Sequence, residues 1–583
     1  MNQISPQIVH PAPMQAGLDD SDSGLERRSS PCRTRAALAL SSCLLVMLSS
    51  CAGSTGGQAA PPQNSGTPSI TLIGANPQLI AIGGAYQELG AIAIDDEDGD
   101  LSAGIVIDAS AVSTSVPGSY LVTYNVSDAD GNAAPARIRT VTITDPSSLT
   151  FVVANNGMDG FELYLTDGSA QGTVMVKDIN PNGDSKPEGF VLINDTLFFS
   201  ASDGAASGRE IWKSDGTEAG TVMLKDISPG SASSNPWALT RVGDTLFFRA
   251  TDIHGTELWK SDGTAAGTVL VRDIDPANGY SSAPSELTDM DGTLFFGARV
   301  ANTTGHELWR SDGTEAGTVI VKNIRLGTGN STPSFLVKFN GALYFSAASH
   351  LNGTELWKSD GTEAGTVMVK DIRPGSGSYP SELTVVGDTL FFAATDDING
   401  IELWKSDGTE AGTVLVKNIN LAGDSRPSEL TDVNGTLFFQ AEESNMVSTE
   451  LWMSDGTLAG TRMVKEISPG GGSRPQSLVN MGGTVLFRAN DGSNGRELWK
   501  SDGTEAGTVM VLDINPTSGS DADPITSFNN FMPIMLPDGR LLFGAMDGTH
   551  GREAWITDGT AAGTTLMNDM SPGTDHGFYR ISH

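Results

Sequence analysis

One phrase recurs through most of this sequence and constrains the fold more than any other feature. It reads ELWKSDGTEAGTVMVKDI at residues 355–372, and near-copies of it fill the chain from about residue 148 to residue 583. The copies begin at Glu162, Glu210, Glu257, Glu307, Glu355, Glu402, Glu450, Glu497 and Glu553. Their spacings are 48, 47, 50, 48, 47, 48, 47 and 56 residues, too regular for coincidence. The chain is therefore an array of repeated supersecondary units.

Each unit contains four short runs of strand-forming residues. In the unit that starts at Thr196 the runs are TLFFSA, REIWKS (209–214), TVMLKDI (221–227) and ALTRVGD (238–244). Gly and Asp mark each reversal of the chain, as tight turns require. We expect four antiparallel strands joined by short loops, with ALTRVGD as the fourth strand of its unit.

The repeated strands are apolar on both faces. Consecutive residues of a strand point to opposite faces, so Phe247 and Phe248 lie on opposite faces, and so do Leu258 and Trp259. Such a sheet needs cover on both sides, which neighbouring units can supply. Four-stranded units of roughly 40–50 residues that cover one another predict an all-β fold, with a large β-propeller over residues 148–583.

The two ends of the array are complementary. It opens on LTFVVAN (149–155) with no fourth strand before it, and it ends on GFYRISH (577–583), which resembles a fourth strand with no unit after it. Pairing the two would close a ring of nine blades, above the usual range of roughly four to eight. An eight-bladed ring with one spare unit is the first alternative, and an open solenoid is the second.

The repeat carries a family resemblance. Glu-Leu-Trp-x-x-Asp-Gly-Thr stands intact at 257–264, 307–314, 355–362, 402–409, 450–457 and 497–504. On these residues the region resembles the ELWxxDGT-repeat family of bacterial exported proteins. The family has little known function, so the resemblance implies a class of protein rather than an activity.

Residues 68–145 form a different module. Short alternating runs such as GSYLVTYNVSD (118–128) and RIRTVTIT (137–144) are typical of a small β-sandwich. The order of ITLIGANPQLIAIGG, GSYLVTYNVSDADGNAA and RTVTIT resembles the bacterial Ig-like domains first named from pesticidal crystal proteins. The resemblance implies an Ig-like sandwich that serves as a spacer or an adhesion module.

Two acidic turns of this module are weak candidates for a Ca²⁺ site. Asp96, Asp98 and Asp100 lie in the first turn, and Asp128 and Asp130 lie in the second. Carboxylates on loops can hold Ca²⁺, which is the one cofactor that the sequence suggests. The EF-hand spacing is not met, and ordinary Asp-Gly β-turns are the favoured interpretation.

Residues 1–51 have the character of an export signal with a long N-terminal extension. Four arginines precede a largely apolar run at 36–48, which is too short to span a bilayer comfortably. The run ends in Leu-Ser-Ser-Cys, which resembles the bacterial lipobox and implies cleavage between Ser50 and Cys51 with lipid attachment at Cys51. An ordinary signal peptide is the alternative. Residues 52–67 are small, polar and Pro-containing, as in a flexible tether.

Certain polar and aromatic residues recur in every unit, whereas an active site needs an asymmetric set of groups. In the third and fifth units these residues are Glu257, Trp259, Asp262, Glu355, Trp357 and Asp360. We interpret all of them as structural. The Asp caps its turn through backbone hydrogen bonds, and the Glu pairs with a repeated Lys such as Lys370 or accepts backbone donors.

The sequence shows no recognisable catalytic motif. It has no nucleophile elbow, phosphate-binding loop, dinucleotide-binding glycine pattern or HExxH, so no catalytic residue is predicted. The net charge of −35 argues against a nucleic-acid partner. Trp237, Tyr280, Tyr379 and Arg474 break the repeat and are candidates for ligand contact, with packing between blades as the favoured role of the aromatic residues.

These features predict a non-catalytic lipoprotein of the cell envelope, exported and lipid-anchored at the outer membrane or cell surface. It would present the propeller as a binding, scaffolding or adhesion module for a protein or glycan ligand. The alternative is a secreted or surface propeller enzyme, a hydrolase or lyase that acts on glycans or peptides.

Overall fold

The computed structural model describes residues 66–580 except 75, 82–83, 117, 145–148, 205, 277–280, 444–447, 517–533 and 572–576. Apart from one 3-10 turn at Ser102–Gly104, every regular element in these ranges is a β-strand, so the all-β prediction is confirmed. None of the described segments forms a helix long and apolar enough to cross a membrane.

The described residues before 145 form two small sheets. One sheet has the order β1 (Ser69–Leu72), β3 (Ala91–Asp95), β4 (Gly99–Asp100). The other has the order β2 (Gln78–Ala81), β7 (Arg137–Thr144), β6 (Gly118–Asn125), β5 (Val106–Asp108). Only β2 and β7 run parallel. Alternate residues of both sheets, such as Ile70 and Val122, meet in one core, as expected for an Ig-like sandwich.

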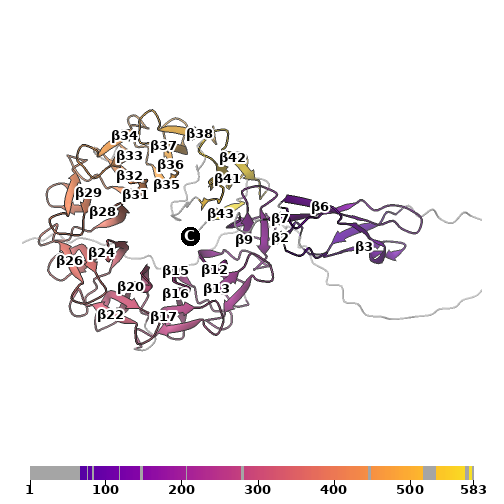
Figure 1. Cartoon of the computed structure of the whole chain (residues 1–583), viewed down its shortest axis with the longest axis horizontal. Helices are drawn as coiled ribbons and strands as arrows, with labels where there is room; N and C mark the ends of the chain where they lie inside the picture. The colour runs from indigo at the N-terminus through magenta and orange to yellow at the C-terminus, as the bar shows by residue number, and fades with distance from the viewer. Residues whose placement is uncertain are drawn as a thin grey trace, which may run out of the picture. The chain divides into compact units, whose positions relative to one another are not determined.

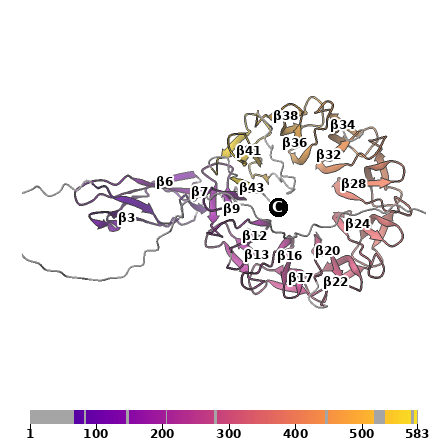
Figure 2. The same ribbon diagram turned by 180° about the vertical axis from the view of Figure 1, so that it is seen from behind.

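The described residues of the repeat region form nine four-stranded sheets, one for each repeat. Figures 1 and 2 show these sheets arranged around a ring, like the blades of a propeller. The strand nearest the middle of the ring is the first strand of its sheet. The first strands are β43 (Phe578–Arg580), β11 (Glu188–Ile193), β15 (Trp237–Val242), β19 (Ser285–Met290), β23 (Ser334–Phe339), β27 (Ser381–Val386), β31 (Ser428–Val433), β35 (Gln476–Met481) and β39 (Ile534–Met535).

The other three strands of each sheet carry the repeated phrase. The second strands are β8 (Thr150–Asn155), β12 (Thr196–Ser202), β16 (Thr245–Asp252), β20 (Thr293–Val300), β24 (Ala342–Ser349), β28 (Thr389–Asp396), β32 (Thr436–Glu442), β36 (Thr484–Asn490) and β40 (Leu541–Ala545). The third strands are β9 (Phe161–Thr166), β13 (Arg209–Ser214), β17 (Gly255–Ser261), β21 (Gly305–Ser311), β25 (Gly353–Ser359), β29 (Gly400–Ser406), β33 (Thr449–Ser454), β37 (Arg496–Ser501) and β41 (Glu553–Thr557). The fourth strands are β10 (Val174–Lys177), β14 (Val222–Lys225), β18 (Val269–Arg272), β22 (Val319–Lys322), β26 (Val367–Lys370), β30 (Val414–Lys417), β34 (Arg462–Lys465), β38 (Val509–Leu512) and β42 (Thr565–Asn568).

The strand order corrects one sequence expectation. The ALTRV run was expected to be the fourth strand of the unit that starts at Thr196, but it lies in β15, which pairs with β16 of the following sheet. The turn at Gly243 and Asp244 is short enough to fold β15 and β16 into a hairpin. Each sheet after the first therefore takes its first strand from the connection that precedes its second strand.

The hydrophobic core is divided among the gaps between neighbouring sheets. In one gap, Phe198 and Ile211 of the second sheet pack against Phe248 and Trp259 of the third. Phe247 points the other way and packs with Phe296 of the fourth sheet. Strands that are apolar on both faces are thus buried on both faces by different neighbours.

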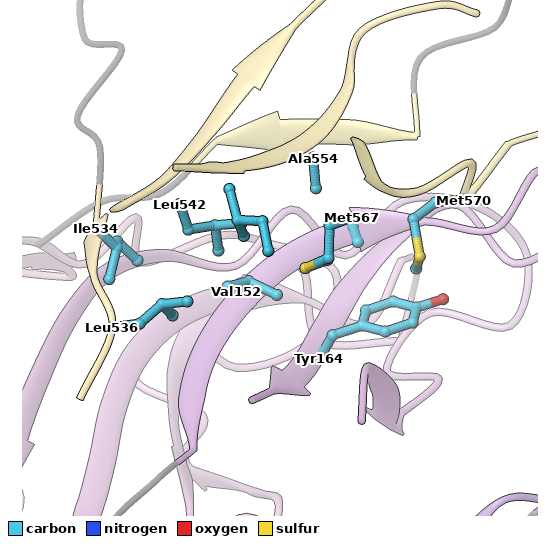
Figure 3. Close-up of a cluster of buried hydrophobic side chains, with 10 residues drawn as sticks. Val152, Tyr164, Ile534, Leu536, Leu542, Ala554, Met567 and Met570 are labelled. Carbon is cyan, nitrogen blue, oxygen red and sulfur yellow. The ribbon is translucent and has the colours of Figure 1, made fainter. Parts of the chain in front are cut away.

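The first and last sheets of the array are in contact. β43 pairs with β8, so the first sheet has the order β10-β9-β8-β43 and contains both ends of the repeat region. Figure 3 shows Val152 and Tyr164 of the first sheet packed against Leu542 and Met567 of the ninth. Contacts between the first and ninth sheets thus take the place of the contacts that join consecutive sheets elsewhere in the array.

Candidate active site

Most first strands begin with the same backbone irregularity. In the sixth and seventh sheets, the residue before a proline (Tyr379 or Arg426) has a positive φ of 51° or 46°. Two residues after the proline, Glu382 and Glu429 also have a positive φ, 59° in each case. The pairing register with the second strand shifts at the same place, which is the signature of a β-bulge. The bulge turns one side chain out of the regular alternation of the strand.

Three sheets place a glutamate at this bulge. The carboxylate of Glu286 accepts the backbone N–H of Phe335 at 2.8 Å. That of Glu382 accepts the N–H of Glu429 at 3.1 Å, and that of Glu429 accepts the N–H of Ser477 at 2.9 Å. Each carboxylate therefore bridges its own first strand and the next one around the ring.

Glu382 and Glu429 form the one adjacent pair among these three carboxylates. Burial raises the pKa of Glu429, and the charge of Glu382 raises it further, while the N–H of Ser477 and the charge of Arg488 oppose the shift. A carboxyl group whose pKa is raised by burial and by a second carboxylate is one kind of group that general acid–base chemistry uses.

Exposed aromatic side chains occur at the same end of the first strands. Trp237 at the start of β15, Phe335 on β23 and Tyr379 just before β27 are 47%, 43% and 60% exposed. The candidates Trp237 and Tyr379 are therefore open to solvent rather than packed between sheets, and Arg474 is exposed as well. Tyr280 lies outside the described residues.

The repeated glutamates have a structural environment. Glu257 is fully buried and accepts the N–H groups of Ile274 and Ser282 at 3.0 and 2.7 Å, and the hydroxyl of Ser282 at 2.6 Å. Glu355 accepts the corresponding groups of Ile372 and Ser378. Burial raises the pKa of Glu355 to about 6. These carboxylates tie the third strand to the connection that follows the fourth.

The repeated lysine Lys370 does not pair with a repeated glutamate, which was one of the two predicted roles of these glutamates. Lys370 instead donates to the carbonyl oxygen of Thr413 in the next sheet, at 2.7 Å. Lys225 does the same to Thr268 and lies 5.8 Å from the centre of the Trp259 ring. The repeated cations therefore join neighbouring sheets.

The Asp and Trp of the phrase serve the turn and the packing between sheets. The carboxylate of Asp262 accepts both the N–H and the hydroxyl of Thr264, at 2.9 and 2.7 Å, and Asp360 makes the same two bonds with Thr362. Trp259 and Trp357 are 5% and 8% exposed in the gaps between sheets. The two Trp side chains are therefore buried in packing contacts, whereas the two Asp side chains are exposed at their turns.

The calcium candidates lie on two turns that touch. Asp98 accepts the N–H of Ala129 from the second turn at 2.9 Å. Asp128 accepts the N–H groups of Asp130 and Asn132, and Asp100 accepts that of Ser102. Asp96 is exposed at the first turn. Within the described ranges, no group of three or more His, Cys, Asp or Glu side chains is placed to hold a metal ion. Ser50 and Cys51 lie outside those ranges.

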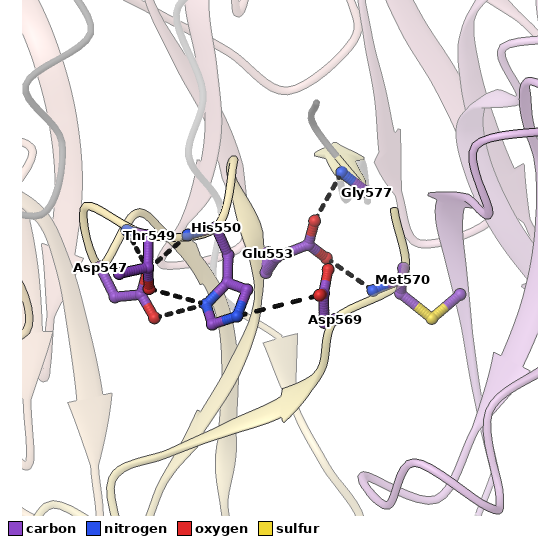
Figure 4. A network of polar contacts seen from close by, with 7 residues as sticks. All are labelled: Asp547, Thr549, His550, Glu553, Asp569, Met570 and Gly577. Carbon is purple, nitrogen blue, oxygen red and sulfur yellow. Dashed lines mark hydrogen bonds and ion pairs between the residues drawn. The ribbon is translucent and has the colours of Figure 1, made fainter. Parts of the chain in front are cut away.

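The ninth sheet contains the only described histidine with carboxylates on both ring nitrogens (Figure 4). Nδ1 of His550 is 2.7 Å from Asp547, and Nε2 is 3.8 Å from Asp569. The hydrogen bond with Asp547 raises the pKa of His550. His254 occupies the same place in the third sheet and contacts Asp273 at 3.3 Å. Because a histidine–aspartate contact recurs at the same place in two sheets, we interpret it as a contact that stabilises the loop rather than as part of a catalytic site.

Sequence reasoning missed the bulge glutamates. They stand in Ser-Glu-Leu segments at 285–287, 381–383 and 428–430, which recur in only three units. A comparison of the units at the residue two places after each proline would have found them.

Comparison with known proteins identifies the N-terminal module. Residues 70–143 match the profile of the family described as "Bacterial surface protein, Ig-like domain". This supports an Ig-like domain of bacterial surface proteins. Among curated proteins, no relative matches the chain.

Several solved structures resemble the chain, at low identity. A puromycin hydrolase is 14% identical with a TM-score of 0.32, and the match covers 62% of this chain and 58% of that one. Oligopeptidase B from Leishmania major is 11% identical with a TM-score of 0.34, covering 64% and 53%. A prolyl endopeptidase is 12% identical with a TM-score of 0.36, covering 64% and 55%. The chain thus matches little more than half the length of these proteins.

These neighbours contradict the main functional prediction. They are hydrolases and peptidases rather than non-catalytic scaffolds, which is nearer to the alternative of a propeller hydrolase or lyase that acts on glycans or peptides. At these identities and TM-scores the likeness carries no conclusion about the activity of this chain. Any activity of this chain has to be argued from its own residues.

Proposed function

We propose that this chain is an exported peptide hydrolase whose reacting groups are Glu382 and Glu429. The observation that carries the proposal is the hydrogen bond from the Glu429 N–H to the Glu382 carboxylate, which holds the side chain of Glu382 against the first strand that carries Glu429. Burial and the charge of Glu382 raise the pKa of Glu429, which favours its protonated form.

The two groups would divide the proton transfers of hydrolysis. Glu382 accepts a proton from the water that attacks the carbonyl carbon of the scissile bond. Glu429 donates its proton to the amide nitrogen as the C–N bond breaks. The products are a carboxylic acid and an amine. The proton held by Glu382 returns to Glu429 directly or through solvent, which restores the starting state.

The first strands favour a peptide over a glycan as the substrate. β27 and β31 each pair with only one strand of their own sheet, so each presents a backbone edge toward the middle of the ring. Such an edge offers N–H and C=O groups to an extended chain. Phe335 and Tyr379 add exposed apolar surface near the carboxylates.

The proposal also covers the cellular location of the chain and the closure of the nine sheets into a ring. The lipobox-like Leu-Ser-Ser-Cys supports lipid attachment at Cys51, and the Ig-like domain would act as a spacer for the repeat region. The pairing of β43 with β8 supports a closed ring of nine blades. The anchor would hold the enzyme at the cell envelope, on the outer membrane or cell surface.

The test is a turnover assay with the purified full chain on a library of quenched fluorescent peptides and a panel of oligosaccharides. We expect peptide cleavage that falls at least about a hundredfold in Glu382→Gln and in Glu429→Gln. Glu286→Gln is the matched control, because Glu286 makes the same bond to the next strand but has Phe335 rather than a carboxylate beside it. Equal turnover in all three variants, or cleavage of glycans alone, would overturn the proposal.

A further inference from the structure

Across two neighbouring strands, a half-buried arginine stands opposite the exposed indole of Trp237. Arg249 on β16 is the register partner of Trp237 on β15, and register partners place their side chains on the same face of a sheet. Phe247, two residues before Arg249, packs against the fourth sheet. Both side chains therefore lie on the face of the third sheet that is turned toward the fourth.

In two other sheets, the residues at this pair of positions bond to each other. In the eighth sheet, Nη2 of Arg488 donates to the side-chain oxygen of Gln476 at 2.9 Å. In the seventh, the side-chain nitrogen of Gln440 donates to the hydroxyl of Ser428 at 2.8 Å. An indole has a donor but no acceptor, so the arginine of the third sheet does not have the partner that its counterpart in the eighth sheet has.

The guanidinium of Arg249 therefore has donors to spare. An arginine has five N–H donors, and Nη1 of Arg249 donates to the carbonyl oxygen of Pro284, just before β19, at 3.3 Å. No carboxylate of the described residues forms an ion pair with Arg249, and burial alone lowers its pKa. A half-buried charge without a countercharge is unfavourable, so a carboxylate supplied by a ligand would stabilise it.

The acidic residues on the adjoining elements are engaged elsewhere. The carboxylate of Asp252, at the end of β16, accepts the N–H of His254 at 2.8 Å. That of Glu286, at the bulge of β19, accepts the N–H of Phe335 in the fifth sheet at 2.8 Å. β15 itself carries no acidic residue. Neither carboxylate is therefore the partner of the arginine.

The backbone around Trp237 is held in place and leaves the indole open to solvent. Asn235 and Ala238, on either side of it, have positive φ values of 47° and 54°. The N–H of Asn235 donates to the carbonyl oxygen of Arg209 at 3.2 Å. Trp237 is 47% exposed, whereas the other eight tryptophans are 3–8% exposed. An apolar ring thus lies open beside unused donors.

We infer that Trp237 and Arg249 form a binding site for the carboxylate of a peptide. The planar guanidinium offers paired N–H donors that match the two oxygens of a carboxylate. The indole offers an apolar surface for the part of the peptide next to that carboxylate. The choice of a peptide rests on the proposed function, because β15 presents the same kind of backbone edge toward the middle of the ring as β27 and β31.

The test is a calorimetric titration of the full chain with three short peptides. All proteins carry Glu382→Gln, so that the proposed reacting groups leave the peptide intact. The first peptide is N-acetylated and ends in a free carboxylate, the second is the same peptide with an amidated end, and the third is amidated but carries one glutamate side chain. We expect the first or the third to bind at least about tenfold more tightly than the second. The one that does shows whether the carboxylate belongs to the terminus or to a side chain.

Variants at the two residues test the assignment. Arg249→Gln should weaken the binding at least about tenfold. Trp237→Gln should do the same, because a glutamine at this position would accept the guanidinium as Gln476 does in the eighth sheet. Trp237→Phe keeps an aromatic ring without an acceptor, so its affinity should stay within about threefold of the parent. Arg241→Gln is the matched control, because Arg241 is an exposed arginine near the other end of β15.

Three outcomes would overturn the inference. The first is equal affinity for all three peptides. The second is an Arg249→Gln variant that binds as tightly as the parent. The third is binding of an oligogalacturonate but of none of the peptides, which would assign the site to an acidic glycan. The titration needs no turnover, so a failure of this inference is distinct from a failure of the proposed hydrolase activity, which would show as absent cleavage by the chain with Glu382 intact.

Discussion

The backbone N–H of Glu429 donates to the carboxylate of Glu382 at 3.1 Å, across the boundary between two sheets. A β-bulge at each position makes this contact possible, because it points both glutamates along the ring rather than across their own sheets. One hydrogen bond therefore joins the side chain of one glutamate to the backbone of another that is 47 residues away in the sequence.

The first prediction concerns the pH dependence of turnover. Burial and the charge of Glu382 raise the pKa of Glu429, and the proposed mechanism uses its protonated form. Activity should therefore decline as pH rises through this raised pKa. In Glu382→Gln the charge that raises the pKa is gone, so residual activity should decline at a lower pH. A pH–rate profile of kcat/KM that declines at the same pH in both proteins would contradict this assignment.

The second prediction concerns the buried glutamates of the repeat. Glu402 is fully buried, and burial raises its pKa to about 7 from 4.5. A carboxyl group with a raised folded-state pKa stabilises the fold at low pH, and this contribution is lost as pH rises from about 4.5 through 7. In the parent, this carboxyl group should lower the unfolding free energy by up to about 3 kcal/mol between pH 4.5 and pH 8. In Glu402→Gln this decrease should be absent. Urea unfolding at both pH values measures it.

A control separates the charge from the hydrogen bonds. Ser425 donates its hydroxyl and its N–H to Glu402, at 2.6 and 3.1 Å. Ser425→Ala keeps the carboxyl group and the N–H but removes the hydroxyl. This variant should lose about 1–3 kcal/mol at pH 8, where the carboxylate is charged and left short of a donor. A Glu402→Gln variant whose stability falls with pH as steeply as the parent would show that this carboxyl group does not carry the effect.

Much of the fold was predictable from the sequence, for definite reasons. The near-regular period and the paired Phe247 and Phe248 require sheets covered on both faces, and the structure has them. ALTRV was assigned to the wrong sheet because a repeating sequence does not show where one structural unit ends and the next begins. The site was harder to predict, since the orientation of Glu382 depends on a bulge with φ of 59°, which residue type alone does not signal.

The third prediction concerns the ninth sheet. The hydrogen bond between His550 and Asp547 raises the pKa of His550 above its usual value. Stability from this pair should be fully present below the unfolded-state pKa of histidine, about 6.5, and should be lost as pH rises through the raised folded-state value. His550 is about one-third exposed, so the effect should stay below about 1 kcal/mol.

NMR titration of the histidine side chains tests this directly. Asp547→Asn should lower the pKa of His550. An unchanged pKa of His550 in that variant would mean that the hydrogen bond with Asp547 does not raise this pKa.

The last prediction tests whether the nine sheets close into a ring. Leu542 lies in the cluster between the ninth and first sheets, and Leu258 lies in the equivalent gap between the third and fourth; both side chains are fully buried. In a closed ring each leucine has a neighbouring sheet on the side that it packs against, so Leu542→Ala and Leu258→Ala should each cost about 2–5 kcal/mol. In an open array Leu542 would lie at a free end, and its replacement would cost far less. Denaturant unfolding that gives Leu542→Ala under about 1 kcal/mol, with Leu258→Ala in the range above, would therefore show an open array in solution.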